Sequence, residues 1–190
     1  NVGNHTAFFA GCGFKVHAWE PFHETYLRLL DNVVNNEWVV KPSMYETVLW
    51  NKDDVFLDVK IIVDSNWGAN QFVEKYLTTP FGQVGREILP GCSELPPEPP
   101  LLQADMSERL ASSSYLSKRV DFYEFPRVDL MKIDVEGAEL TLLEGAAETI
   151  RRCQPAIVVE VHSPPVTRAA VSDLLKKIGH TGVLIMNGGV

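Results

Sequence analysis

The pattern of apolar and polar positions predicts that strands and helices alternate along most of the chain. Residues 128–135 form an apolar run typical of a parallel strand that is covered on both faces, where strict alternation is not required. The run breaks at Glu136-Gly137-Ala138, and a helical pattern follows with apolar residues three or four positions apart. These residues are Leu140, Leu143, Ala147 and Ile150. A strand, an acidic turn and a helix together make half of a βαβ unit.

The beginning of the chain repeats this order. Residues 1–6 form a glycine-containing turn that opens a short helix ending at a glycine. A strand at 14–19 follows and is closed by Glu20-Pro21. Residues 22–34 are predicted to be helical, with an apolar stripe of Leu27, Leu30 and Val34.

The remaining pattern is less regular in the middle and clear again near the end. We predict strands at 39–40, 44–50 and 55–63 (the last two paired as a hairpin), loops at 61–70 and 90–100, a helix at 107–119, a strand at 156–162, a helix at 166–178 and a strand at 183–186. The final helix has the stripe Val171, Leu174, Leu175 and Ile178, and Gly179 caps it. Alternating elements of this kind indicate an α/β fold with a mostly parallel sheet.

Lys132 is unusual for a covered strand, because burying an ammonium group without a partner is very unfavourable. Alternation places it on the same face as Asp134. Glu160 lies in a similarly apolar setting in the predicted strand 156–162. We expect Lys132 to pair with Glu160, with Asp134 or with both, which requires the two strands to be neighbours. The pairing would either only fix the strand register or take a direct part in catalysis.

Acidic residues follow the predicted strands, at the end of the sheet where α/β proteins bind their ligands. Asp134 and Glu136 follow the central strand, with Glu139 close by. Glu20 lies seventeen residues after Gly3, a separation at which a carboxylate can accept hydrogen bonds from ribose hydroxyls. Glu46 (or Thr47) stands near the end of a third parallel strand, where an acid could hold an adenine amine.

Composition narrows the possible classes of function. The 190 residues suffice for a single domain, taken as 1–190. A content of 45% hydrophobic and 22% charged residues is typical of globular proteins. The net charge of -8, without clustered lysine or arginine, argues against binding to nucleic acid or to anionic membranes. Three distant cysteines and five scattered histidines predict no metal site, no disulfide framework and a reducing, cytoplasmic location.

The run from Lys132 to Glu139, KIDVEGAE, with Gly145 just after it, resembles the signature of the FkbM family of S-adenosylmethionine-dependent methyltransferases. Four further segments match that family in order and spacing. They are Gly3-Asn4-His5-Thr6, residues 16–21 (VHAWEP), residues 30–32 (LDN) and residues 155–160 (PAIVVE). The resemblance covers nearly the whole chain.

The resemblance implies a class I (Rossmann-like) methyltransferase fold with helices on both faces of the sheet, and S-adenosylmethionine as the cofactor. It places Asn1, Gly3, Asn4, His5 and Thr6 in the cofactor turn, with Glu20 on the ribose and Glu46 near the adenine. Asp134 and Glu136 would lie beside the transferable methyl group, and O-methylation of a small molecule, sugar or glycoconjugate is the implied chemistry.

An alcohol that accepts a methyl group must also lose its proton, so a general base is expected. Asp134 or Glu136 is the candidate, with His162 as the alternative, and Lys132 could tune their proton affinity or orient them. Two departures from the family pattern stand out. The apolar first strand is missing before Asn1, as in a truncated domain, and the stretch 82–127 is a variable loop or lid where acceptor specificity would lie.

Two other classes of function compete with a methyltransferase. A nicotinamide-dependent dehydrogenase would need three spaced glycines in the cofactor turn, and only Gly3 is present there. A non-catalytic binding module that keeps the fold is the second alternative, and the missing first strand favours it. Binding of the cofactor would separate that module from an enzyme.

Overall fold

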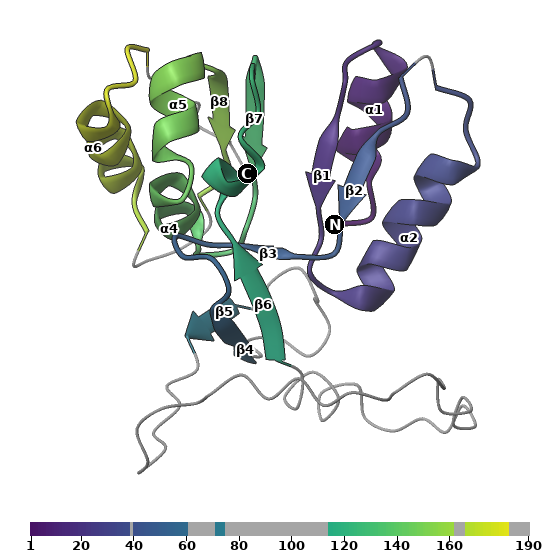
Figure 1. The fold of residues 1–190 in the computed structure, drawn as a ribbon, viewed down its shortest axis with the longest axis horizontal. Helices are drawn as coiled ribbons and strands as arrows, with labels where there is room; N and C mark the ends of the chain where they lie inside the picture. Colours follow the sequence, from purple (N-terminus) through teal and green to yellow (C-terminus); the bar gives the residue numbers. More distant parts are fainter. Residues whose placement is uncertain (39, 61–70, 75–113, 162–165, 183–190) are drawn as a thin grey trace.

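A computed structural model describes residues 1–38, 40–60, 71–74, 114–161 and 166–182. The described elements form two α/β halves and a third, mixed sheet, most of which lies below the half with β7 and β8 in the view of Figure 1. Three predicted segments lie outside the described residues. These are the loops at 61–70 and 90–100 and the strand at 183–186.

The first half pairs two short parallel strands with two helices. Strand β1 (His17–Trp19) is hydrogen-bonded in parallel to β2 (Ser43–Tyr45), with Trp19 opposite Tyr45. Helices α1 (Asn4–Gly11) and α2 (His23–Val34) lie beside this pair (Figure 1). The turn, helix, strand and helix predicted for this part of the chain are therefore all present.

The buried face of α2 differs from the predicted stripe. Leu29 and Val33 are fully buried, whereas Leu27 and Val34 are largely exposed. The reason is a contact made far along the chain: Leu29 packs directly under Gly3, at the start of α1. Leu30 with Val34, and Leu29 with Val33, both have helical spacing, one residue apart. Packing against α1 buries the pair Leu29 and Val33 instead of the predicted pair.

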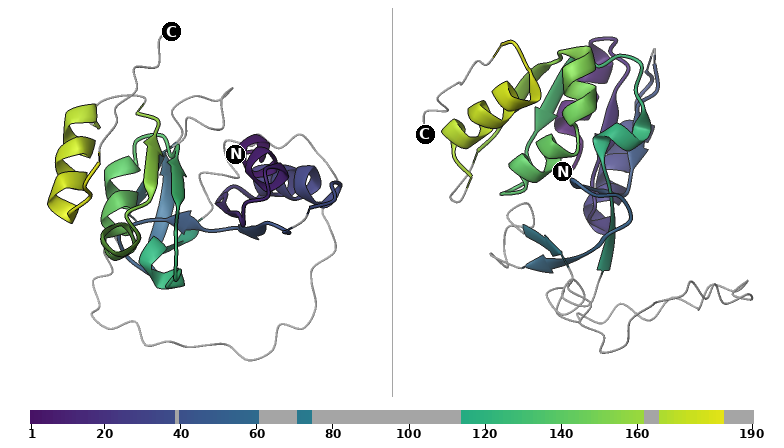
Figure 2. Two further views of the ribbon diagram at one scale, coloured as in Figure 1. Left: turned by 90° about the horizontal axis from the view of Figure 1, so that it is seen from above. Right: turned by 60° about the vertical axis from the view of Figure 1, so that its left-hand side comes forward.

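The second half also contains a parallel pair of strands. Strand β7 (Leu130–Ile133) pairs with β8 (Ala156–Val159), with Lys132 opposite Val158. Helices α4 (Glu139–Glu144), α5 (Ala147–Cys153) and α6 (Arg168–Ile178) pack together on one side of the pair, with α6 outermost in both views of Figure 2. Their shared core contains Val120, Ile133, Leu142, Leu143, Ala146, Ile150, Val166, Val171, Leu175 and Ile178.

The helical stretch after β7 is interrupted, although its pattern predicted one continuous helix. It breaks between α4 and α5 at Gly145 and Ala146. The carboxylate of Asp121 accepts hydrogen bonds from the backbone amides of Glu148 (3.1 Å) and Thr149 (2.8 Å) in the first turn of α5. An acceptor from a distant segment thus satisfies amides that open a new helix.

The third sheet corrects two predictions. Its strand order is β3 (Val48–Leu49), β6 (Ser114–Lys118), β4 (Phe56–Lys60) and β5 (Gln71–Glu74). The hairpin between 44–50 and 55–63 is wrong, because β6 lies between β3 and β4. The helix predicted at 107–119 is wrong for residues 114–118, which form the strand β6, so this part of the stretch 82–127 is not a loop.

The described strands do not make the single sheet that the resemblance implied. They form three sheets, of which β1–β2 and β7–β8 are wholly parallel and the third is mixed. Helices cover one side of β7–β8 in the described part of the chain. The α/β character and the parallel pairs agree with the prediction, and a Rossmann-like sheet with helices on both faces stays an expectation.

Candidate functional site

Charged side chains meet where β7 and β8 end. The ammonium group of Lys132 lies 3.1 Å from Oδ2 of Asp134 and 3.6 Å from Oε2 of Glu160. The backbone amide of Glu160 donates a hydrogen bond to the carbonyl of Ile133 (2.9 Å), which aligns the two strand ends. Lys132 was predicted to pair with Glu160, with Asp134 or with both, and in the structure it pairs with both across neighbouring strands.

This ion network is more exposed than the sequence suggested. The side chains of Lys132, Asp134 and Glu160 are 21%, 28% and 55% exposed. The mostly apolar sequence predicted a strand covered on both faces. In the structure, helices α4 to α6 cover only the face of β7 opposite to Lys132. Water reaches all three groups, so each stays accessible to a ligand and the pairing itself adds little stability.

The turn after β7 has an unusual backbone. Glu136 (φ 47°) and Gly137 (φ 98°) are both left-handed, a conformation that costs a non-glycine residue about 1 kcal/mol. Glu139 follows at the first position of α4, where its Oε1 accepts a hydrogen bond from the amide of Gly137 (2.9 Å). Strained residues of this kind often occur where a side chain must point in a functional direction. His162, the alternative base, lies outside the described residues.

Two acids, Glu20 and Glu46, directly follow the paired strands β1 and β2. The amide of Glu20 donates to the carbonyl of Tyr45 (3.0 Å), so Glu20 and Glu46 end neighbouring parallel strands. Glu20 is only 5% exposed, and its carboxylate accepts from the backbone amide of Phe22 (2.9 Å) and pairs with the amino group of Asn1. Glu46 is exposed and contacts Nδ1 of His23 at 2.9 Å.

The predicted cofactor turn lies against Glu20. Gly3 has a left-handed backbone (φ 94°), which favours glycine, and a Cβ atom there would also stand 2.7 Å from Cδ1 of the Leu29 side chain. Asn4 and His5 are exposed in the first turn of α1. Thr6 is buried. The structure thus brings Asn1 of the predicted turn to Glu20 and places Gly3 against Leu29.

A cluster of aromatic rings joins the two halves, and sequence reasoning missed it. The ring centroids of His17 and Phe125 are 4.6 Å apart, and those of Trp19 and Tyr123 are 5.3 Å apart. Tyr123 belongs to η2 (Val120–Tyr123), which follows β6. Burial, and next the charge of Lys15, lower the pKa of His17 below its usual value. The alternation of His17 and Trp19 along β1 was the available signal for this face.

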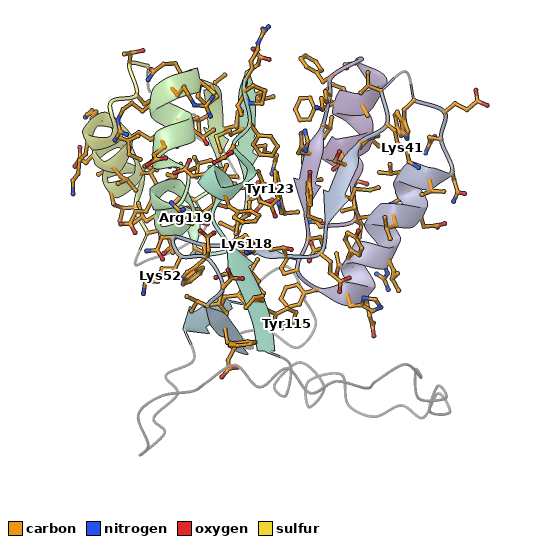
Figure 3. All side chains as sticks on the ribbon, in the orientation of Figure 1. Lys41, Lys52, Tyr115, Lys118, Arg119 and Tyr123 are labelled. Atoms are coloured by element: carbon orange, nitrogen blue, oxygen red, sulfur yellow. The ribbon has the colours of Figure 1, made fainter. Side chains whose placement is uncertain are left out.

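An ion pair between Asp53 and Arg119 joins the loop beside the third sheet to the start of η2. Figure 3 labels Lys118 and Arg119 where β6 ends, with Lys52 near them. Burial would raise the pKa of Asp53, but hydrogen bonds from the backbone amide (2.7 Å) and Nε (2.8 Å) of Arg119 outweigh it and hold the pKa below its usual value. We assign this pair to the packing of the loop 51–54 against β6.

Two other kinds of feature are absent from the described ranges. They contain no group of three or more histidine, cysteine, aspartate or glutamate side chains that could hold a metal ion. No helix among them is both long and apolar enough to cross a membrane.

Comparison with known families agrees with the motifs. The family model described as Methyltransferase FkbM domain matches residues 1–180. The chain belongs to the FkbM methyltransferase family. No curated protein and no solved structure gives a significant match. The family match includes both pairs of parallel strands and the acids at their ends.

Proposed function

We propose that this FkbM methyltransferase transfers a methyl group from S-adenosylmethionine to a hydroxyl group of a small molecule, sugar or glycoconjugate. The observation that carries the proposal is the family match over residues 1–180. It is supported by Glu20 and Asp134, which follow parallel strands in the two halves. Ligands of α/β proteins bind at such strand ends.

The residues around Glu20 fit an adenosine group. The carboxylate of Glu20 is held by the amide of Phe22 and directed at the turn that contains Gly3. In this role its oxygens would accept hydrogen bonds from the ribose hydroxyls, while Gly3 allows close backbone approach. Asn4 and His5 would line the turn from the first turn of α1, and Glu46 would bind the adenine amine.

The cofactor would supply an electrophilic methyl group on a sulfonium. The protein's part is to align the acceptor hydroxyl with that methyl group and to take up the hydroxyl proton. Asp134 or Glu136 would serve as the base at the end of β7. Lys132, 3.1 Å from Asp134, would keep that carboxylate in place. Oxygen is proposed as the acceptor atom because a carboxylate beside the methyl group suits an alcohol, which must lose a proton.

Calorimetric titration with S-adenosylhomocysteine tests the proposal directly. We expect micromolar binding by the wild-type chain and a roughly tenfold to hundredfold weaker affinity for Glu20→Ala, because hydrogen bonds to a charged group are lost. Glu37→Ala is the matched control, since Glu37 is an exposed glutamate shortly after α2. A folded wild-type chain that does not bind would contradict the proposal and favour a non-catalytic binding module.

A further inference from the structure

Glu139 places a carboxyl group in buried, apolar surroundings. Its exposed fraction is 0%, and it lies beside Leu142 and Leu143 at the start of α4. Its Oε1 accepts the hydrogen bond from the Gly137 amide, and its Oε2 has no hydrogen-bond partner within the described part of the chain. Buried polar atoms without a partner are rare in folded proteins.

Packing alone does not account for this carboxylate. Burying a charged group is unfavourable unless it is well paired, and an apolar side chain of similar length would fill the same space without that penalty. An acid in the first turn of a helix can favour the helix dipole, but a surface position does this equally well. Glu148 provides that kind of charge, exposed, in the first turn of α5.

Glu139 holds the turn after β7 by a hydrogen bond. Gly137 and the preceding Glu136 both have left-handed backbones, so the direction of the Glu136 side chain depends on the amide plane between them. The hydrogen bond from Gly137 to Glu139 fixes that plane. Without an acceptor at residue 139, the Gly137 amide would be left unsatisfied, and the turn could relax to conformations that a glutamate prefers.

We infer that Glu139 is a positioning residue that holds the carboxylate of Glu136 toward the cofactor's sulfonium. This inference rests on the proposed function. A correctly placed Glu136 attracts the positive sulfonium of S-adenosylmethionine but has no such charge to attract in S-adenosylhomocysteine. By positioning Glu136, Glu139 therefore determines how much more tightly the site binds S-adenosylmethionine than S-adenosylhomocysteine.

The experiment compares four variants of the chain, the first of which, Glu136→Gln, removes the charge of the side chain that is to be positioned. Glu139→Met keeps the length and fills the space but removes the acceptor. Glu139→Gln keeps an oxygen that can accept from Gly137. Leu142→Ala weakens the same helix without touching the turn, because Leu142 is a buried core residue of α4. The measurements are hydrogen exchange of the Gly137 amide by NMR and the affinities for S-adenosylmethionine and S-adenosylhomocysteine by calorimetry.

We expect Glu139→Met to speed exchange of the Gly137 amide about tenfold and to reduce the preference for S-adenosylmethionine about fivefold. Glu136→Gln should reduce the same preference by a similar factor. Glu139→Gln should restore both properties. Leu142→Ala should lower thermal stability and leave the preference unchanged, which separates positioning from general loosening.

The inference is overturned if Glu139→Met keeps a protected Gly137 amide, or if the cofactor preference survives when that protection is lost. Should Glu139→Met not fold, the wild-type chain still decides: a Gly137 amide that exchanges as fast as that of the exposed Gly182 would refute the positioning role. A wild-type chain that binds neither compound would overturn the proposed function and this inference together. Failure of the variants alone would overturn only the inference.

Discussion

The backbone carbonyl of Trp50 occupies the space that a side chain at Gly145 would need. An ideal Cβ atom on Gly145 would overlap the carbonyl oxygen and stand 2.9 Å from the carbonyl carbon. Trp50 in turn is held by a hydrogen bond from its amide to the carbonyl of Lys118 (2.9 Å). The break between α4 and α5 is therefore the point where the second half meets the third sheet.

Replacing Gly145 by alanine should destabilise the protein by about 3 kcal/mol, because the opposing atoms belong to backbone and cannot rotate away. Denaturant unfolding measures the effect. Gly182→Ala is the control, since a Cβ atom there meets nothing within 4 Å. Equal stability of the two variants would show that the segments containing Trp50 and Gly145 can separate at no cost.

The identity of the general base can be decided between Asp134 and Glu136. Once an acceptor has been found by screening with methyl-labelled cofactor, Asp134→Asn and Glu136→Gln should be compared at saturating acceptor. We expect replacement of the residue that serves as the base to lower kcat about a hundredfold, since proton transfer in the transition state is lost. Asp173→Asn, an exposed residue of α6, is the control. Unchanged turnover removes the residue in question from the role.

Local pattern was sufficient to predict several parts of this structure. The strand, acidic turn and helix start around Glu136 follow from residues that are close in sequence. The neighbouring positions of β7 and β8 followed from a physical need, since Lys132 required a carboxylate and Glu160 was available. The stripe of α6 was also predicted, because only one face of that helix is apolar.

The errors share one cause, which is contact between distant segments. β6 lies between β3 and β4, and neither strand alone indicates that a segment more than fifty residues later will separate them. The break at Gly145 depends on Trp50, and the buried face of α2 depends on Gly3. The burial of Glu139 was equally hidden, because a glutamate at a helix start is usually an exposed residue.

The aromatic cluster gives the protein a predictable sensitivity to acid. Burial of His17, and then the charge of Lys15, lower the pKa of the His17 imidazole, so the folded state favours the neutral ring. The unfolded chain binds a proton at its ordinary pKa of 6.5, before the folded chain does. Stability from this group is therefore fully present above pH 6.5 and falls as the pH drops from there toward the lowered pKa of the folded state.

His17→Phe should remove this part of the pH dependence while preserving ring contact with Phe125, which now lies 4.6 Å away between centroids. Lys15→Met should reduce it only in part, because burial is the larger cause. Urea unfolding between pH 5 and pH 8 measures both effects as differences from the wild-type chain, so that other titrating groups cancel. If the wild-type and His17→Phe curves stay parallel across this range, the histidine does not titrate differently in the folded and unfolded states, and the cluster tolerates its charge.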